Sequence, residues 1–65
     1  MSYVLKNAKT KEYMAVGKEG DTIGFAFVKE KAEAWVVPTY KFAEHYRNAL
    51  KVLTGDKIVI EEIDG

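Results

Sequence analysis

Residues 39–55 constrain the fold more than any other segment, because they combine a helical pattern with a start and a stop. At about 3.6 residues per turn, one stripe of a helix over this segment collects six apolar side chains. They are Phe42, Ala43, Tyr46, Ala49, Leu50 and Leu53. Thr39 is the expected N-cap, and Gly55 suits the left-handed conformation that often follows a helix. We therefore expect one amphipathic helix over residues 39–54 that packs through this stripe.

Four segments before this helix and one after it have the alternation or the β-branched and aromatic residues typical of strands. They are residues 2–6, 12–16, 23–28, 34–37 and 57–63. Polar and glycine-containing residues at 7–11 and 17–22 predict turns between the first three. The expected fold is α+β in the order β-β-β-β-α-β. It is a small, twisted, mainly antiparallel sheet with the helix packed on one face.

Residues 30–37 admit two interpretations. Two adjacent valines and a short charged link after residue 28 favour a strand that forms a hairpin with the preceding one. A helix that begins near Glu30 and is ended by Pro38 is the alternative. The last segment, 57–63, has apolar residues on both faces, which predicts a strand that is central or covered on both sides.

The chain is short and lacks the usual reinforcements of small domains. Its 65 residues suffice for a single domain, residues 1–65. A domain of this size buries only roughly 60% of the surface that its unfolded chain exposes. Cysteine is absent, so disulfides and thiolate metal sites are impossible, and a single histidine cannot build a histidine-rich site. We expect no metal and no cofactor, and stabilisation by packing or self-association.

Apolar residues are predicted on both faces of the sheet, although one helix covers only one face. Four large side chains fall where no cover is predicted: Ile23, Phe25, Phe27 and Trp35. We interpret them as a protein-interaction or dimer face and expect a homodimer, the commonest symmetric assembly. The alternative is a sheet that curls strongly enough to leave no apolar face exposed.

Side chains that could act together in catalysis are scarce. One serine, no cysteine and one histidine do not supply a nucleophile with its base. Glu61 and Glu62 are neighbours in a predicted strand and point to opposite faces, which excludes a cooperating carboxylate pair. We therefore expect no catalytic residues and no enzymatic activity.

Basic residues on the polar side of the helix form a second candidate binding face: Lys41, His45, Arg47 and Lys51. With aromatic rings on an open sheet, they would suit a nucleic acid. However, ten basic and ten acidic residues give a formal net charge of zero, which argues against an affinity that depends mainly on phosphate contacts. Nucleic-acid binding is therefore the alternative to a protein partner.

Membrane association is not expected from the sequence. No apolar run approaches the ~20 residues of a membrane span, and the first residues lack the pattern of a secretory signal. We expect a cytoplasmic protein.

Three stretches carry a resemblance that covers most of the chain: YVLKNAKTKEYMAV, KFAEHYRNAL and KIVIEEI. In their order and style they resemble small uncharacterised proteins of bacteriophages and prophages of Gram-positive bacteria. The resemblance implies a non-enzymatic protein in the host cytoplasm that binds, and inhibits or modulates, a host or defence protein. A structural or assembly accessory protein is a further alternative.

Overall fold

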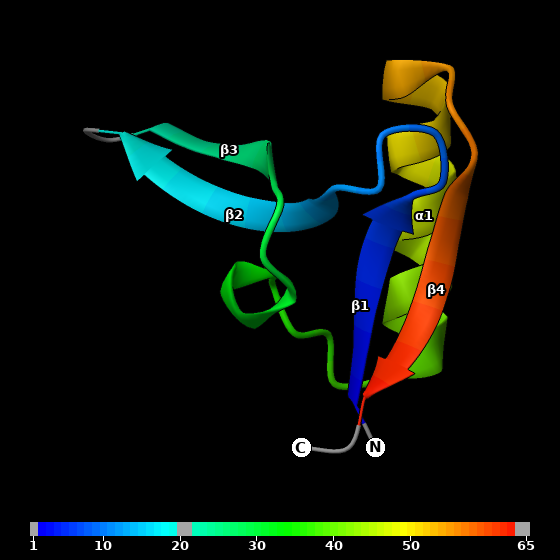
Figure 1. The fold of residues 1–65 in the computed structure, drawn as a ribbon. Helices are drawn as coiled ribbons and strands as arrows, with labels where there is room; N and C mark the ends of the chain where they lie inside the picture. The colour runs from blue at the N-terminus through cyan, green and yellow to red at the C-terminus, as the bar shows by residue number, and fades with distance from the viewer. Residues whose placement is uncertain (1, 20–21, 64–65) are drawn as a thin grey trace.

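A computed structural model describes residues 2–19 and 22–63 of the 65-residue chain. Its elements, in chain order, are β1 (Ser2–Asn7), β2 (Tyr13–Glu19), β3 (Thr22–Val28), the 3-10 helix η1 (Lys31–Glu33), α1 (Tyr40–Thr54) and β4 (Ile58–Ile63). The four strands form one sheet in the order β3-β2-β1-β4, and all neighbours are antiparallel. The prediction of a small α+β fold with one amphipathic α-helix is confirmed (Figure 1).

The sheet divides between β1 and β2. β1 pairs with β4 along its whole length, but its only register position with β2 is Lys6 opposite Tyr13. Further along β1, Tyr3 instead forms an isolated antiparallel bridge with Val37, through backbone hydrogen bonds of 2.9 and 2.7 Å. Residues 35–37 thus take the place beside β1 that β2 leaves. The β2–β3 hairpin projects away from the rest of the molecule (Figure 1).

The strand predicted at residues 34–37 is therefore wrong, and so is the hairpin that it was to form with the preceding strand. The chain makes the short turn η1 and then crosses from one part of the sheet to the other. The Trp35 N–H donates to the Met14 carbonyl of β2, whereas Val37 pairs with Tyr3 of β1. A segment whose successive backbone groups bond to different strands cannot form a ladder with either. The helical alternative is realised only as the 3-10 turn.

Other bounds also differ from expectation. β2 and β3 extend to Glu19 and from Thr22, so most of the loop expected at 17–22 is strand; residues 20 and 21 lie outside the described residues. β4, expected to be central or covered on both sides, is an edge strand that has α1 on one face and η1 on the other, and β1 is central. The apolar residues on both faces of β4 did not indicate its place in the strand order.

The main core lies between α1 and the sheet. Its buried members come from every element except β3 and η1, and they are Leu5, Met14, Val37, Ala43, Leu50 and Ile58. Ala43 and Leu50 are seven residues apart, two turns of a helix, and so project in the same direction. This direction is the one in which α1 contacts β1 and β4.

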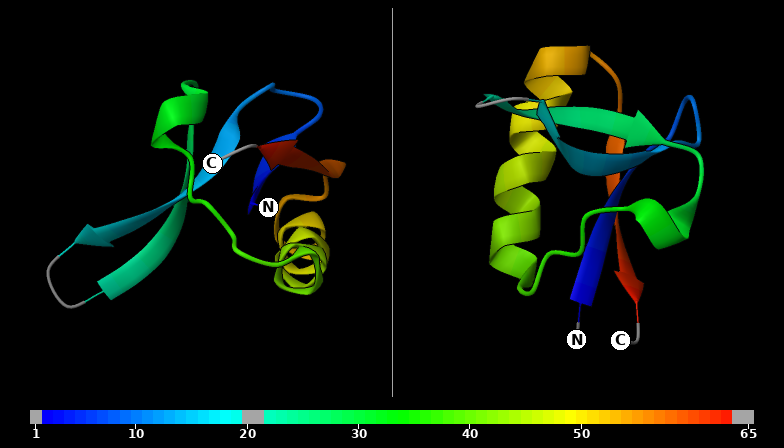
Figure 2. Two further views of the ribbon diagram at one scale, coloured as in Figure 1. Left: turned by 90° about the horizontal axis from the view of Figure 1, so that it is seen from below. Right: turned by 90° about the vertical axis from the view of Figure 1, so that its left-hand side faces the viewer.

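The face of β1 and β4 away from α1 is covered by the chain itself. Val4 alternates with the core residue Leu5, points to this second face, and is completely buried. Figure 2 shows η1 on this side of the sheet, opposite α1. Lys31 of η1 forms an ion pair and hydrogen bond with Glu61, the residue opposite Val4 on β4. The hydrogen bond to Glu61 raises the pKa of Lys31.

The predicted helix ends are confirmed. The Phe42 N–H donates to the Thr39 hydroxyl at 3.3 Å, which makes Thr39 the N-cap. Gly55 has φ of 73°, and its N–H donates to the Lys51 carbonyl at 2.9 Å. Both devices are local, because each uses residues within one turn of the helix end.

Asn7 joins two loops at the opposite end of the sheet from the termini. It is buried, and its side-chain oxygen accepts from the N–H groups of Lys9 at 2.9 Å and Thr10 at 3.2 Å. Its side-chain nitrogen donates to the Asp56 carboxylate at 3.2 Å. The Ala8 N–H adds a bond to the Lys57 carbonyl at 2.9 Å. The turn predicted to begin at Asn7 is thereby tied to the loop that follows α1.

We predict that Asn7→Ala lowers the free energy of unfolding by about 1–3 kcal/mol, because it leaves the part-buried N–H groups of Lys9 and Thr10 without their acceptor. Asp56→Ala removes only one bond of the same group and should cost less, about 0.5–1.5 kcal/mol. Urea denaturation followed by circular dichroism measures both. Equal costs for the two variants would contradict the role assigned to the Asn7 oxygen.

We also predict that Gly55→Ala lowers the free energy of unfolding by about 1–2 kcal/mol, the cost of a Cβ in the left-handed region. Apart from its two chain neighbours, no residue lies within 4 Å of the added Cβ, so the cost would be conformational and not a clash. Gly24→Ala is the matched control, since a Cβ there also meets nothing within 4 Å and the residue is in a strand. A Gly55→Ala variant as stable as Gly24→Ala would exclude this explanation.

Candidate protein-interaction surface

One face of the β2–β3 hairpin begins in the core and continues into solvent. Met14 lies opposite Phe27 and Val16 lies opposite Phe25, so these four side chains share this face. Met14 is buried and Phe27 packs against the core. Farther along the hairpin, Val16 and Phe25 are exposed. The apolar face of the hairpin therefore extends beyond the core.

α1 continues this exposed apolar surface. The Tyr46 ring contacts Phe25 edge-on, with ring centroids 6.0 Å apart, and Trp35 in the same manner at 4.9 Å. Phe42 precedes Tyr46 by one turn and Leu53 follows it by two, so both lie on the same side of the helix. We call the exposed residues Val16, Phe25, Phe42 and Leu53 the hairpin–helix surface. Their exposed fractions range from 42% to 72%.

The apolar stripe of α1 is only partly buried, contrary to the expectation that all of it packs on the chain. Ala43 and Leu50 are buried, Tyr46 and Ala49 are half-buried, and Phe42 and Leu53 are exposed. The apolar stripe is wide, and α1 is rotated about its axis so that only one edge of the stripe contacts β1 and β4. The other edge faces the side on which the hairpin projects.

The four residues predicted as an uncovered face have different environments. Phe25 is exposed, whereas Phe27 and Trp35 are partly buried against the core. Ile23 lies on β3 opposite Lys18, and its side chain lies outside the described residues. Phe25 and Trp35 meet through Tyr46, a residue that sequence reasoning assigned to the core stripe alone.

Sequence reasoning missed Val16, Phe42 and Leu53 as surface residues. No local signal separates them from core residues, since each has the apolar character and spacing of a buried position. Only the projection of the hairpin and the roll of α1 place them in solvent.

An open depression lies beside Phe42 at the N-terminal end of α1. Thr39, Lys41, Phe42 and His45 line it, and it has a volume of about 550 Å³. Its wall thus combines one large apolar ring with polar groups of the helix. This volume is larger than one side chain, and because the depression is open it is suited to a segment of a partner.

The predicted basic face of α1 is not one patch. Lys41 and His45 are one turn apart, as are Arg47 and Lys51, but the two pairs are separated by roughly 120° around the helix axis. Arg47 also approaches the Glu44 carboxylate, with 3.8 Å between nitrogen and oxygen. The four residues share the polar side of the helix without converging on one ligand.

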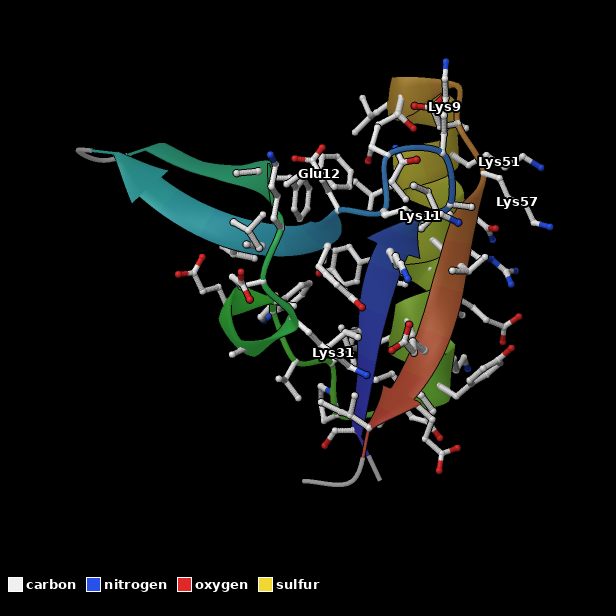
Figure 3. The ribbon with its side chains drawn as sticks, viewed as in Figure 1. Lys9, Lys11, Glu12, Lys31, Lys51 and Lys57 are labelled. Carbon is white, nitrogen blue, oxygen red and sulfur yellow. The ribbon has the colours of Figure 1, made fainter. Side chains whose placement is uncertain are left out.

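Lys51 instead joins lysines from other segments. Lys9 and Lys11 are in the β1–β2 turn and Lys57 is in the loop after α1, and Figure 3 shows them with Lys51 at one end of the molecule. We call these four the lysine end. Asn7 and Ala8 hold the two loops together at this end. Among the side chains of residues 2–16 and 24–63, the ion pairs formed are Lys31–Glu61 and Arg47–Glu44, so none of these involves the lysine end.

Neither a metal site nor a membrane-spanning helix is found in the described part of the chain. No group of three histidine, aspartate or glutamate side chains there could hold a metal ion. No described helix is long and apolar enough to cross a membrane. Comparison of the chain with protein-family models, curated proteins and solved structures finds no match.

We predict that Leu53→Ala changes the free energy of unfolding by less than about 0.5 kcal/mol, the usual limit for exposed positions. Leu50→Ala, three residues earlier and buried, should cost about 2–5 kcal/mol. Urea denaturation of both variants tests the roll of α1. Comparable losses would mean that Leu53 is covered in the free protein.

Proposed function

We propose that this chain is a small non-enzymatic protein-binding module that docks on a protein partner through its hairpin–helix surface. The observation that supports the proposal is the exposure of Val16, Phe25, Phe42 and Leu53 around Tyr46. Large apolar side chains gathered on one surface of a small protein are typical of interaction sites. Their release from water on docking would drive the association.

The composition of the surface favours a protein over a small molecule as its partner. Phe42, which is 57% exposed, supplies an aromatic anchor, and such anchors carry much of the energy of protein interfaces. The depression beside Phe42 would accept a segment of the partner, while Lys41 and His45 would form part of a polar rim. A flat surface formed by two elements, with one open depression, is typical of a site for a protein. Small molecules are usually bound in pockets that enclose them.

The resemblance to phage and prophage proteins suggests the class of partner. In this proposal the partner is a host or defence protein, and occupation of its surface inhibits or modulates it. The protein would act as a homodimer in the host cytoplasm.

The test is a pull-down from host lysate with the tagged protein, followed by calorimetry with the purified partner that mass spectrometry identifies. Phe42→Ser with Leu53→Ser should abolish binding, because it removes two apolar contacts while leaving buried Leu50 in place. The matched control is Val52→Ser, which removes an exposed apolar residue roughly 100° around the helix from Leu53. Equal affinities of the unmodified protein, the double serine variant and Val52→Ser for the partner would refute the proposed surface.

A second candidate function is nucleic-acid binding at the lysine end. The supporting observation is the gathering of Lys9, Lys11, Lys51 and Lys57 from three segments, without an ion pair to the described residues (Figure 3). Four phosphate contacts would make the logarithm of the affinity fall with the logarithm of salt with a slope of about −3 to −4.

Fluorescence anisotropy with single- and double-stranded DNA and RNA tests this second candidate. Lys51→Glu should weaken binding and reduce the salt slope, and Lys41→Glu, which lies outside the lysine end, should change them less. Absence of binding at low salt to all four probes would eliminate it.

A further inference from the structure

The two edge strands of the sheet differ in their protection against pairing. β4 carries Glu61 and Glu62, and Lys31 is bound to Glu61, so charged groups lie along that edge. β3 has the sequence TIGFAFV, with no charge and no proline. Edge strands usually carry lysine, proline, a bulge or a cover that prevents association with another strand. β3 has no charged residue or proline that would prevent such association, and it is the outer strand of the projecting hairpin (Figure 1).

We infer that β3 pairs antiparallel with β3 of a second copy of this chain. β3 has seven residues, and Phe25 is the middle one. If all seven pair around a twofold axis, Phe25 lies opposite Phe25 of the second copy. The same register puts Gly24 opposite Ala26. This inference rests on the proposed function in one respect: it takes the hairpin part of the hairpin–helix surface as a binding surface and names a second copy as its partner. The helix residues Phe42 and Leu53 stay available for a different protein.

The identity of the occupant follows from the hydrogen-bonding groups of the edge. An apolar face alone accepts many partners, but the outer side of β3 presents a row of backbone donors and acceptors that matches the ladder of another strand. A second copy supplies a strand of equal length and apolar character at equal concentration. Directly opposed residues lie on the same face of a sheet, so the two Phe25 rings would cover each other.

The arrangement also supplies what the hairpin lacks. A two-stranded hairpin is marginally stable in water, and β2 is joined to β1 at only one register position. Pairing of two copies places both hairpins in the middle of an eight-stranded sheet, from twice the four strands of one copy. Because a twofold axis of this kind is perpendicular to the sheet, both α1 helices would lie on the same side.

Cysteine cross-linking tests the register, because the chain has no cysteine of its own. Opposed residues of an antiparallel pair have Cα atoms about 4.5–5.5 Å apart, within the range that a disulfide spans. Phe25→Cys should therefore form a disulfide-linked dimer under mild oxidation. Val52→Cys, which is also highly exposed but lies on α1, controls for random collision and should not form a disulfide-linked dimer.

A second pair of variants keeps the test valid if Phe25→Cys does not fold. Ala26→Cys alone should not cross-link, since its equivalent in the second copy is a diagonal neighbour about 7–8 Å away. A mixture of Ala26→Cys with Gly24→Cys should cross-link, and a Cβ at Gly24 meets no atom within 4 Å. Equal cross-linking of Ala26→Cys alone and of the mixture would overturn the register.

Light scattering of the unmodified protein tests this inference independently of partner capture, the central claim of the proposed function. The expected result is a dimer of two 7.3 kDa chains that Ala26→Lys, a charge placed on β3, converts to monomer with its circular dichroism spectrum retained. A monomer at every concentration tested would overturn β3 pairing, as would a dimer that Ala26→Lys leaves intact. Neither result would affect capture of a partner by Phe42 and Leu53, which the serine variants measure.

Discussion

The backbone hydrogen bonds between Tyr3 and Val37 are the interaction on which the rest of the structure depends. They bring residues 35–37 beside the central strand β1, in the place where β2 would otherwise continue its pairing. β2 keeps a single register position with β1 and then leaves with β3 as a projecting hairpin. Because the same segment follows η1, the crossing also brings Lys31 to Glu61 and covers the second face of β1 and β4.

The projection of the hairpin determines which apolar residues are free. A hairpin that stayed flat in the sheet would place Val16 and Phe25 under the helix, whereas here they extend beyond the core, and Phe25 contacts the helix at Tyr46. The helix is correspondingly rolled toward β1 and β4, which leaves Phe42 and Leu53 in solvent. The exposed surface is thus a consequence of the crossing and not of an excess of apolar residues in any one element.

The proposed protein partner and the proposed second copy would use different parts of this surface, so the two proposals are compatible. The free edge of β3 offers backbone groups that another strand satisfies, while Phe42 and Leu53 offer side chains on a helix. In a twofold assembly both helices would lie on one side of the joined sheet, so a partner would meet two equivalent sites. The lysine end is separate from both, held by Asn7 and Ala8 between two loops.

The sequence by itself determined the features that depend on nearby residues. Thr39 and Gly55 set the ends of α1, Asn7 set the first turn, and alternation indicated four strands within a few residues of their bounds. Only the tertiary structure decided that β4 is at an edge, that 34–37 is not a strand, and that Phe42 and Leu53 are exposed. The reason is physical: caps and turns bond within a few residues, whereas strand order and helix roll depend on contacts between segments far apart in the chain. An apolar residue at a helical or strand spacing has the same pattern whether such a contact forms or not.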